Sequence, residues 1–218
     1  MHCVCCYDRR VATRGGTDED RRARGERTRR DLIAAGRALF VDPGFFKATI
    51  GDLVSRSGVG TRGAFYHHFE SKEELFHAVF REVERDLMLR SLAQPPPGRS
   101  AWERLVSGLR GFLDAAAEPE VQRIILVDGP VILGWQKLRA IQEAGSMAAI
   151  EVLVHRAIAE GSIEPQPVRE FTHMLVAALE EAALLVAHSP DPDAARMSSA
   201  EVLDRLLRAL TTSLPAGQ

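Results

Sequence analysis

The sequence has few cysteines and no long uncharged apolar run, and both absences exclude whole classes of protein. Its three cysteines are Cys3, Cys5 and Cys6, so no disulfide can form within the rest of the chain, as in proteins of a reducing compartment. No stretch of about 18 uncharged apolar residues occurs, which excludes a transmembrane helix. The first residues also lack the apolar centre of a secretory signal. We therefore expect a cytoplasmic protein without a membrane partner.

The cysteine cluster at the N-terminus allows two interpretations. Cys3, Cys5 and Cys6 beside His2 could bind a soft metal. The spacing is weak, however, and no cysteine elsewhere could complete the site. We expect the alternative, a disordered tail over residues 1–25, and no metal or cofactor in the protein.

Charge is distributed unevenly although the formal net charge is only −2. Arginines crowd residues 9–30, where they are interrupted by the acidic group Asp18, Glu19 and Asp20. A basic arm before a folded segment is typical of contact with phosphate groups, and it is equally typical of a solvated tail. Both interpretations stay open.

Period-2 alternation and internal repeats are absent, and Ala, Leu, Arg and Glu recur throughout, which predicts an all-α protein. In the first predicted helix, Leu32, Ile33, Gly36, Leu39 and Phe40 share one face. Asp42-Pro43-Gly44 should end it.

Two short helices and a tight glycine turn follow. Thr49 and Asp52 form a helix-start pattern, and Gly58 and Gly60 interrupt the chain after it. A third helix should run from Thr61 to about His67. Two short helices joined in this way form a helix-turn-helix, whose second helix can enter the DNA major groove.

A longer fourth helix, from Lys72 to about Ala93, is predicted by Ser71 and Glu74 at its start and by the prolines of "QPPPGRS" at its end. Further amphipathic or apolar helices are predicted over residues 101–117, 120–142, 146–163, 168–189 and 195–214. The segment 120–142 is apolar on more than one face and should be buried. Gly129-Pro130 should kink or split it.

The segments "FFKATIGDLVSRSGV" and "TRGAFYHHFESKEELF" together resemble the N-terminal region of the TetR family of bacterial transcriptional regulators. "ILVDGPVILGW" resembles, more loosely, the ligand-binding domain of that family. The resemblance implies a helix-turn-helix domain over 26–72, a connecting helix over 73–94, and a larger helical ligand-binding and dimerisation domain over 95–218. It also implies a ligand-responsive repressor that binds a near-palindromic operator in double-stranded DNA as a homodimer.

The resemblance assigns DNA contacts residue by residue. It implies phosphate contacts for Thr49, Tyr66 and Lys72, a helix cap and DNA contact for Thr61, and a groove contact for Arg62, whose fork suits guanine. Gly63 would allow close approach, and His67 would contact phosphate or base. Phe65 and Phe69 would instead pack in the core. The turn from Gly58 to Tyr66 is one residue longer than is usual in the family, through an extra glycine at Gly60.

The second half should enclose a pocket for an apolar or aromatic effector and should carry the dimer interface. The candidate pocket residues are Trp102, Phe112, Trp135, Leu138, Met147, His155, His173 and Met174. Glu180 could add a polar contact beside His173. The candidate interface residues are Phe171, Leu175, Ala178, Leu179, Ala182, Leu203, Leu206, Leu207 and Leu210.

Other functions have less support. No glycine-rich phosphate loop, nucleophile elbow or zinc-protease motif occurs, and His155, His173 and Glu180 have no diagnostic spacing, so we expect no enzyme. RNA binding by stacked aromatics usually needs a sheet, which is not predicted. A helical adaptor with a vestigial DNA-binding head remains an alternative because of Gly60.

Overall fold

The computed structural model describes residues 18–92 and 99–211 and is helical throughout these ranges. They contain nine α-helices and two π-helical segments, with one isolated bridge between Ile163 and Thr211 in place of any strand. The predicted all-α class is confirmed. None of the helices in these ranges is long and apolar enough to cross a membrane.

The elements follow one another in this order: α1 Asp18–Leu39, η1 Phe40–Gly44, α2 Ile50–Ser57, α3 Arg62–His68, α4 Lys72–Leu92, α5 Ala101–Ala115, η2 Val121–Asp128, α6 Gly129–Ala144, α7 Ser146–Ala159, α8 Val168–Ala187 and α9 Pro192–Arg208.

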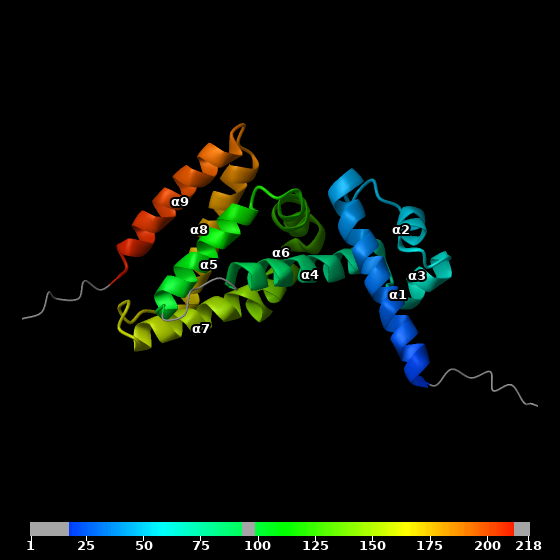
Figure 1. The fold of residues 1–218 in the computed structure, drawn as a ribbon, viewed down its shortest axis with the longest axis horizontal. Coiled ribbons are helices and arrows are strands. Elements are labelled where there is room, and N and C mark those ends of the chain that lie inside the picture. The colour runs from blue at the N-terminus through cyan, green and yellow to red at the C-terminus, as the bar shows by residue number, and fades with distance from the viewer. Residues whose placement is uncertain (1–17, 93–98, 212–218) are drawn as a thin grey trace, which may run out of the picture.

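Helix α4 connects a small head to a larger helical body. Figure 1 shows α1, α2 and α3 at one end, α5 and α7–α9 at the other, and α4 running between them. The first turns of α4 bury Leu75 and Phe76 in the head, and its later turns bury Val83 and Leu87. Helix α4 therefore contributes buried side chains to both the head and the body.

The head is built around closely packed aromatic rings. The rings of Phe40, Phe45 and Phe76 lie 5.2–5.5 Å apart, centroid to centroid, and all three side chains are buried. Phe65 and Phe69 are buried as well, as expected for core residues.

Helix α1 begins earlier than predicted. It starts at Asp18, so the expected disorder of residues 18–25 is wrong. The acidic residues Asp18, Glu19 and Asp20 occupy its first turn, where negative charge favours a helix, and Arg21 pairs with Asp18 at 2.8 Å. The cysteine cluster with His2 lies outside the described residues.

The segment 120–142 is divided at the predicted place, since the π-helix η2 ends at Asp128 and α6 begins at Gly129. The backbone stays helical across this boundary, and Pro130 lies in the first turn of α6, where no amide hydrogen is needed for the helix. The chain instead departs from helical geometry at Gly134, whose φ is +70°. The residues before the predicted break form the π-helix η2.

Candidate DNA-binding surface and ligand pocket

The start of α2 is fixed by a reciprocal cap, as predicted. The Thr49 hydroxyl accepts a hydrogen bond from the Asp52 amide at 3.2 Å, and the Asp52 carboxylate accepts from the Thr49 amide at 2.9 Å. These bonds from the side chain and backbone of Thr49 hold the pKa of Asp52 below its usual value. The hydroxyl of Thr49 is exposed at the surface of the head.

The lengthened turn between α2 and α3 uses two left-handed glycines. Gly58 ends α2 with φ +71°, and Gly60 has φ +83°. Between them Val59 packs against the core. Thr61 then accepts a hydrogen bond from the Ala64 amide at 3.1 Å, so its predicted role as the cap of α3 is confirmed. The extra residue is absorbed without loss of either helix end.

Helix α3 has one buried and one exposed face. Phe65 is fully buried, whereas the neighbouring Tyr66 is 54% exposed. Arg62, Gly63 and His67 are also exposed. Figure 1 shows α2 and α3 at the end of the molecule away from α9. Six of the seven predicted DNA contacts, all except Lys72, are therefore exposed to solvent, at the N-terminal cap of α2 and along α3 with its cap.

Lys72 has partners within the head. Its ammonium group donates to the carbonyl oxygens of Phe45 at 2.7 Å and Ala48 at 2.9 Å, and it lies 4.3 Å from the centre of the Phe45 ring. It fastens α4 to the segment that leads into α2. We therefore assign Lys72 a structural role and leave it out of the proposed DNA contacts.

His68, unlike His67, lies toward the inside of the head. Burial, together with the positive potential of His67 and Arg29, lowers the pKa of His68. Arg29 in turn lies 5.0 Å from the centre of the Phe69 ring. His68 therefore lies on the core side of α3, whereas His67 is exposed.

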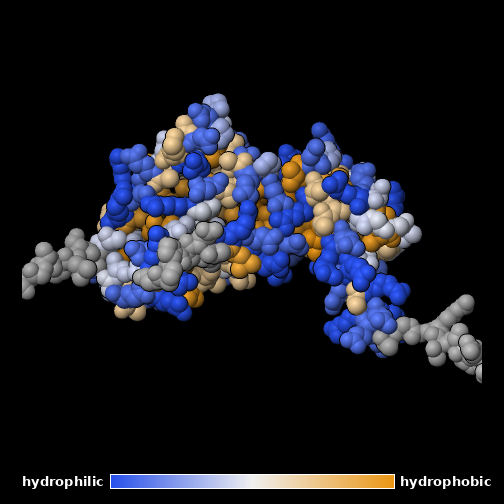
Figure 2. Space-filling view, viewed as in Figure 1, coloured by the Kyte–Doolittle hydropathy of each residue, from blue (hydrophilic) through white to orange (hydrophobic). Residues whose placement is uncertain are grey.

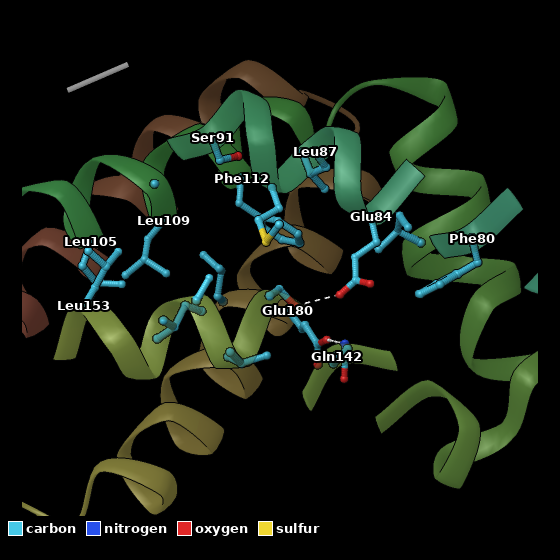
Figure 3. A pocket seen from close by; sticks show the side chains of 18 residues that line it. Phe80, Glu84, Leu87, Ser91, Leu105, Leu109, Phe112, Gln142, Leu153 and Glu180 are labelled. Carbon is cyan, nitrogen blue, oxygen red and sulfur yellow. Dashed lines mark hydrogen bonds between the residues drawn. The ribbon is translucent and has the colours of Figure 1, made fainter. Parts of the chain in front are cut away.

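A cavity of about 780 Å³, including the space at its mouth, opens within the body between α4, α5, α7 and α8. Its lining is mostly apolar and consists of Phe80, Glu84, Leu87, Met88, Ser91, Leu105, Gly108, Leu109, Phe112, Ile125, Gln142, Ser146, Ala149, Ile150, Leu153, Val176, Leu179 and Glu180. Figure 3 shows Leu105, Leu109 and Leu153 at one end of this group and Glu84, Gln142 and Glu180 toward the other.

Only one predicted pocket residue, Phe112, lines this cavity. Trp135 and Met174 are 68% and 73% exposed, and Trp135 stacks under Arg139 on the surface. His155 is exposed, and His173 lies 3.6 Å from Glu143 outside the cavity. The remaining three, Trp102, Leu138 and Met147, are buried in the packed interior. Most large apolar side chains of the interior pack between helices and do not border the cavity. Large size and apolar character in the sequence therefore did not identify the residues that line it.

The polar end of the cavity combines groups from four helices. The Glu84 carboxylate on α4 accepts a hydrogen bond from the Ser146 hydroxyl at the start of α7, at 2.8 Å. Gln142 on α6 donates to Glu180 on α8. Burial raises the pKa of Glu84, and the nearby Glu180 adds to the rise, while hydrogen bonds from Ser146 oppose it. Of these residues, only Glu180 was considered as a pocket contact on sequence grounds.

The outward face of α8 and α9 carries apolar side chains, although not all of the predicted ones. Leu206, Leu210 and Ala178 are exposed, and Phe171 and Ala182 are partly buried. Four of the predicted interface residues are buried within the subunit instead: Leu175, Leu179, Leu203 and Leu207. The exposed stripe contains other large side chains in their place, namely Met174, Leu185, Met197 and Val202.

Arg37 joins the head to the body. From α1 it donates to Asp86 on α4 at 2.7 Å and to Glu120, just before η2, at 2.8 Å. The hydrogen bond from Arg37 to Glu120 is the largest cause of a raised Arg37 pKa. Burial alone would raise the pKa of Asp86, but the bond and charge of Arg37 outweigh it and hold that pKa below its usual value.

A second contact between body and head joins Arg123 on η2 to Gly44 in the head. Arg123 on η2 pairs with the buried Asp128 at 3.0 Å. Its guanidinium covers Gly44 in the head so closely that a Cβ there would lie 2.7 Å from an Arg123 nitrogen. Since Ile125 on the same segment lines the cavity, η2 touches both the cavity and the head.

Family models match both halves of the chain. Residues 32–79 match the model described as bacterial regulatory proteins, tetR family, and residues 102–210 match the model described as tetracyclin repressor-like, C-terminal domain. The first match spans the helix-turn-helix, and the second spans the cavity and the exposed stripe of α8 and α9.

Individual relatives agree with these matches. A crystal structure of a TetR-family transcriptional regulator from Pectobacterium atrosepticum is 30% identical, with a TM-score of 0.77 over 88% of this chain and 98% of that one. The transposon Tn10 TetC protein of Escherichia coli is 27% identical over 63% of this chain and 68% of its own length. A probable acrEF/envCD operon repressor of E. coli K12 is 33% identical over 41% of this chain and 42% of its own. The chain belongs to the TetR family of bacterial transcriptional regulators.

Proposed function

We propose that this protein is a ligand-responsive repressor that binds a near-palindromic operator as a homodimer. The observation that carries the proposal is the open face of the capped helix α3, with Arg62, Gly63, Tyr66 and His67 exposed while Phe65 anchors the helix from behind. A short helix held in this way can lie in the major groove. Arg62 would read a base, and Thr49, Thr61 and Tyr66 would contact phosphates.

Dimerisation would place the second α3 at the neighbouring half-site. The exposed stripe of α8 and α9 supports a two-fold interface, because a symmetric contact uses the same apolar surface on both subunits. Met174, Leu185, Met197, Val202 and Leu206 supply most of that surface. Two recognition helices fixed about one DNA turn apart would require an inverted repeat in the operator.

The effector would act on the head through α4 and η2. Phe80 and Glu84 of α4 and Ile125 of η2 line the cavity, and the same two segments hold Arg37 and Gly44 of the head. A ligand that fits better when these segments shift would change the angle of the head and thus the spacing of the two α3 helices. The operator is released only to the extent that the ligand prefers that state.

The same proposal places the protein in the cytoplasm, with operator DNA and a small molecule as its partners, and assigns it no catalytic role. A helical adaptor with a vestigial head would keep the dimer stripe, but it would not need exposed groove-reading side chains on a capped helix.

Selection from random duplex DNA tests the proposal. The purified protein is incubated with the pool, and the retained DNA is amplified and sequenced over several rounds. Enrichment of an inverted repeat with half-sites about one turn apart is expected. Retention that depends on salt but enriches no sequence would contradict base reading by α3 and would favour the adaptor.

A further inference from the structure

The charge inside the cavity is negative and is not balanced by any basic lining residue. Glu84 and Glu180 are the only charged side chains among the described residues that line it, and no Lys, Arg or His lines it. Neither glutamate forms an ion pair within residues 18–92 and 99–211. Arg81, which acts on Glu84 through its charge, does not line this cavity; it lies in the adjoining cleft between α1, α4 and α6, which Glu84 and Ser146 also line.

Gln142 positions the Glu180 carboxylate at the edge of the cavity. The residue is 7% exposed, and its amide nitrogen donates to Glu180. Its carbonyl oxygen is buried and has no hydrogen-bond partner in the described part of the chain. That oxygen is closed to solvent and to the cavity, so the contribution of Gln142 to the cavity is the bond that positions the Glu180 carboxylate. Figure 3 shows Gln142 beside Glu180, with Glu84 nearby on the same side of the cavity.

Glu84 also has a structural partner. It accepts from the Ser146 hydroxyl at 2.8 Å, at the N-terminus of α7, where a carboxylate is favoured by the helix dipole. This role explains the presence of Glu84. It does not explain the charge of Glu180, which belongs to another helix. The two carboxylates come from α4 and α8 and lie at one end of an otherwise apolar cavity.

We infer that the effector is a lipophilic amine, with an apolar or aromatic body and one protonated primary or secondary ammonium group. The ammonium hydrogens would be donated to the carboxylates of Glu84 and Glu180, and the body would lie among Leu105, Leu109 and Leu153. This inference rests on the proposed function, since it names the ligand class of the regulatory pocket.

Other ligand charges fit the same groups less well. A carboxylate would face two glutamates in a cavity of low polarity. An alcohol would satisfy one acceptor and leave both charges unbalanced. A quaternary ammonium would balance charge, but it has no hydrogen to donate to either carboxylate. A protonated amine supplies both the charge and the donors.

Calorimetric titration of the full-length protein at pH 7 with three matched probes tests the inference. Phenylbutylamine, phenylbutanol and phenylbutyrate share one apolar body and differ in the polar group. The amine is expected to bind at least about 10-fold more tightly than the alcohol or the acid, which corresponds to the contribution of one charged hydrogen bond. An amine that binds no better than the alcohol, or does not bind, overturns the inference.

Variants locate the effect. Glu180→Gln removes a charge without touching the Ser146 bond, and it should weaken amine binding about 10-fold or more while changing alcohol binding less than about two-fold. Glu84→Gln should act in the same direction. Glu151→Gln on α7 is the matched control, because it removes one negative charge from a helix that lines the cavity but lies outside the lining. Equal amine affinity in Glu180→Gln and Glu151→Gln would overturn the inference.

Operator binding by the same preparations separates this inference from the proposed function. A protein that enriches an inverted repeat but does not prefer the amine refutes only the ligand class. A protein that prefers the amine but enriches no DNA sequence refutes the repressor function and leaves the ammonium site in place.

Discussion

Removing the charge of Arg37 should loosen the joint between head and body. Arg37→Met keeps most of the aliphatic stem and leaves Glu120, Asp86 and Glu82 without their shared cation. The head would then be held to the body mainly by α4 and by the contact of Arg123 with Gly44. Both stability and operator affinity should fall.

The expected loss of stability depends on how exposed Arg37 and its carboxylate partners are. A well-buried hydrogen bond between charged groups contributes about 1.5–3 kcal/mol, and an exposed ion pair contributes about 0–1 kcal/mol. The Arg37 side chain is 25% exposed, and those of Asp86 and Glu120 are 34% and 27% exposed. An intermediate total of about 2 kcal/mol is therefore reasonable, and a chain of this size should lose roughly 4–8 °C in melting temperature.

Arg90→Met provides the matched control. Arg90 on α4 makes a two-pronged pair with Glu118 at 3.1 Å, within the body and without contact to α1. Scanning calorimetry and fluorescence anisotropy on the selected operator would be measured for both variants without ligand. Arg37→Met should lose about 10-fold in operator affinity, since its heads no longer hold the half-site spacing, and Arg90→Met should not. Equal operator affinity and equal melting temperature in the two variants would contradict the claim that Arg37 holds the head to the body.

Three further perturbations test separate parts of the structure. Glu84→Gln should raise the melting temperature of the ligand-free protein at pH 8, because burial raises the pKa of Glu84 and makes its charged form unfavourable. The gain should vanish near pH 4, where Glu84 is itself protonated. A gain of the same size at both pH values would contradict this reasoning. Gly129→Ala should destabilise the protein by about 1–3 kcal/mol in urea unfolding despite the better helix propensity of alanine, because its Cβ would lie 2.6 Å from a Phe80 ring carbon. Leu206→Glu, at a position 58% exposed on α9, should convert the proposed dimer to a monomer in light scattering, and an unchanged dimer mass would exclude that face as the interface.

The head could be predicted from the sequence because its signals are local. Thr49 with Asp52, and Thr61 three residues before Ala64, determine their helix starts through bonds between near neighbours. Gly58 and Gly60 mark the turn because their backbone is left-handed. None of these features depends on how distant helices pack.

The cavity could not be predicted in the same way, because its lining depends on which helix faces meet. Glu84 lies among other charged residues of α4 and has the pattern of a solvated position, yet it borders the cavity. Trp135 was expected inside, but the backbone break at Gly134 precedes a tryptophan that lies on the surface under Arg139. When a helix has apolar residues on several faces, its sequence does not specify which of those residues pack against other helices and which border the cavity.

The dimer stripe shows the same ambiguity. Helix α8 carries apolar residues on two faces, one through Leu175 and Leu179 and another through Met174 and Leu185. Helical periodicity identifies both faces and does not distinguish the one that packs within the subunit from the exposed one. The packing of α8 against α5, α7 and α9 decides it.

The most direct test of the central claim is the operator affinity of the double variant Arg62→Ala and Tyr66→Ala, compared with the unchanged protein, with the mass of each protein measured alongside. Both side chains are exposed on α3 and neither holds the core, so the variant should fold and dimerise normally. Loss of one base contact and one phosphate contact predicts an affinity lower by roughly 30-fold or more, about 2 kcal/mol. Unchanged affinity for the selected operator would contradict DNA recognition by α3.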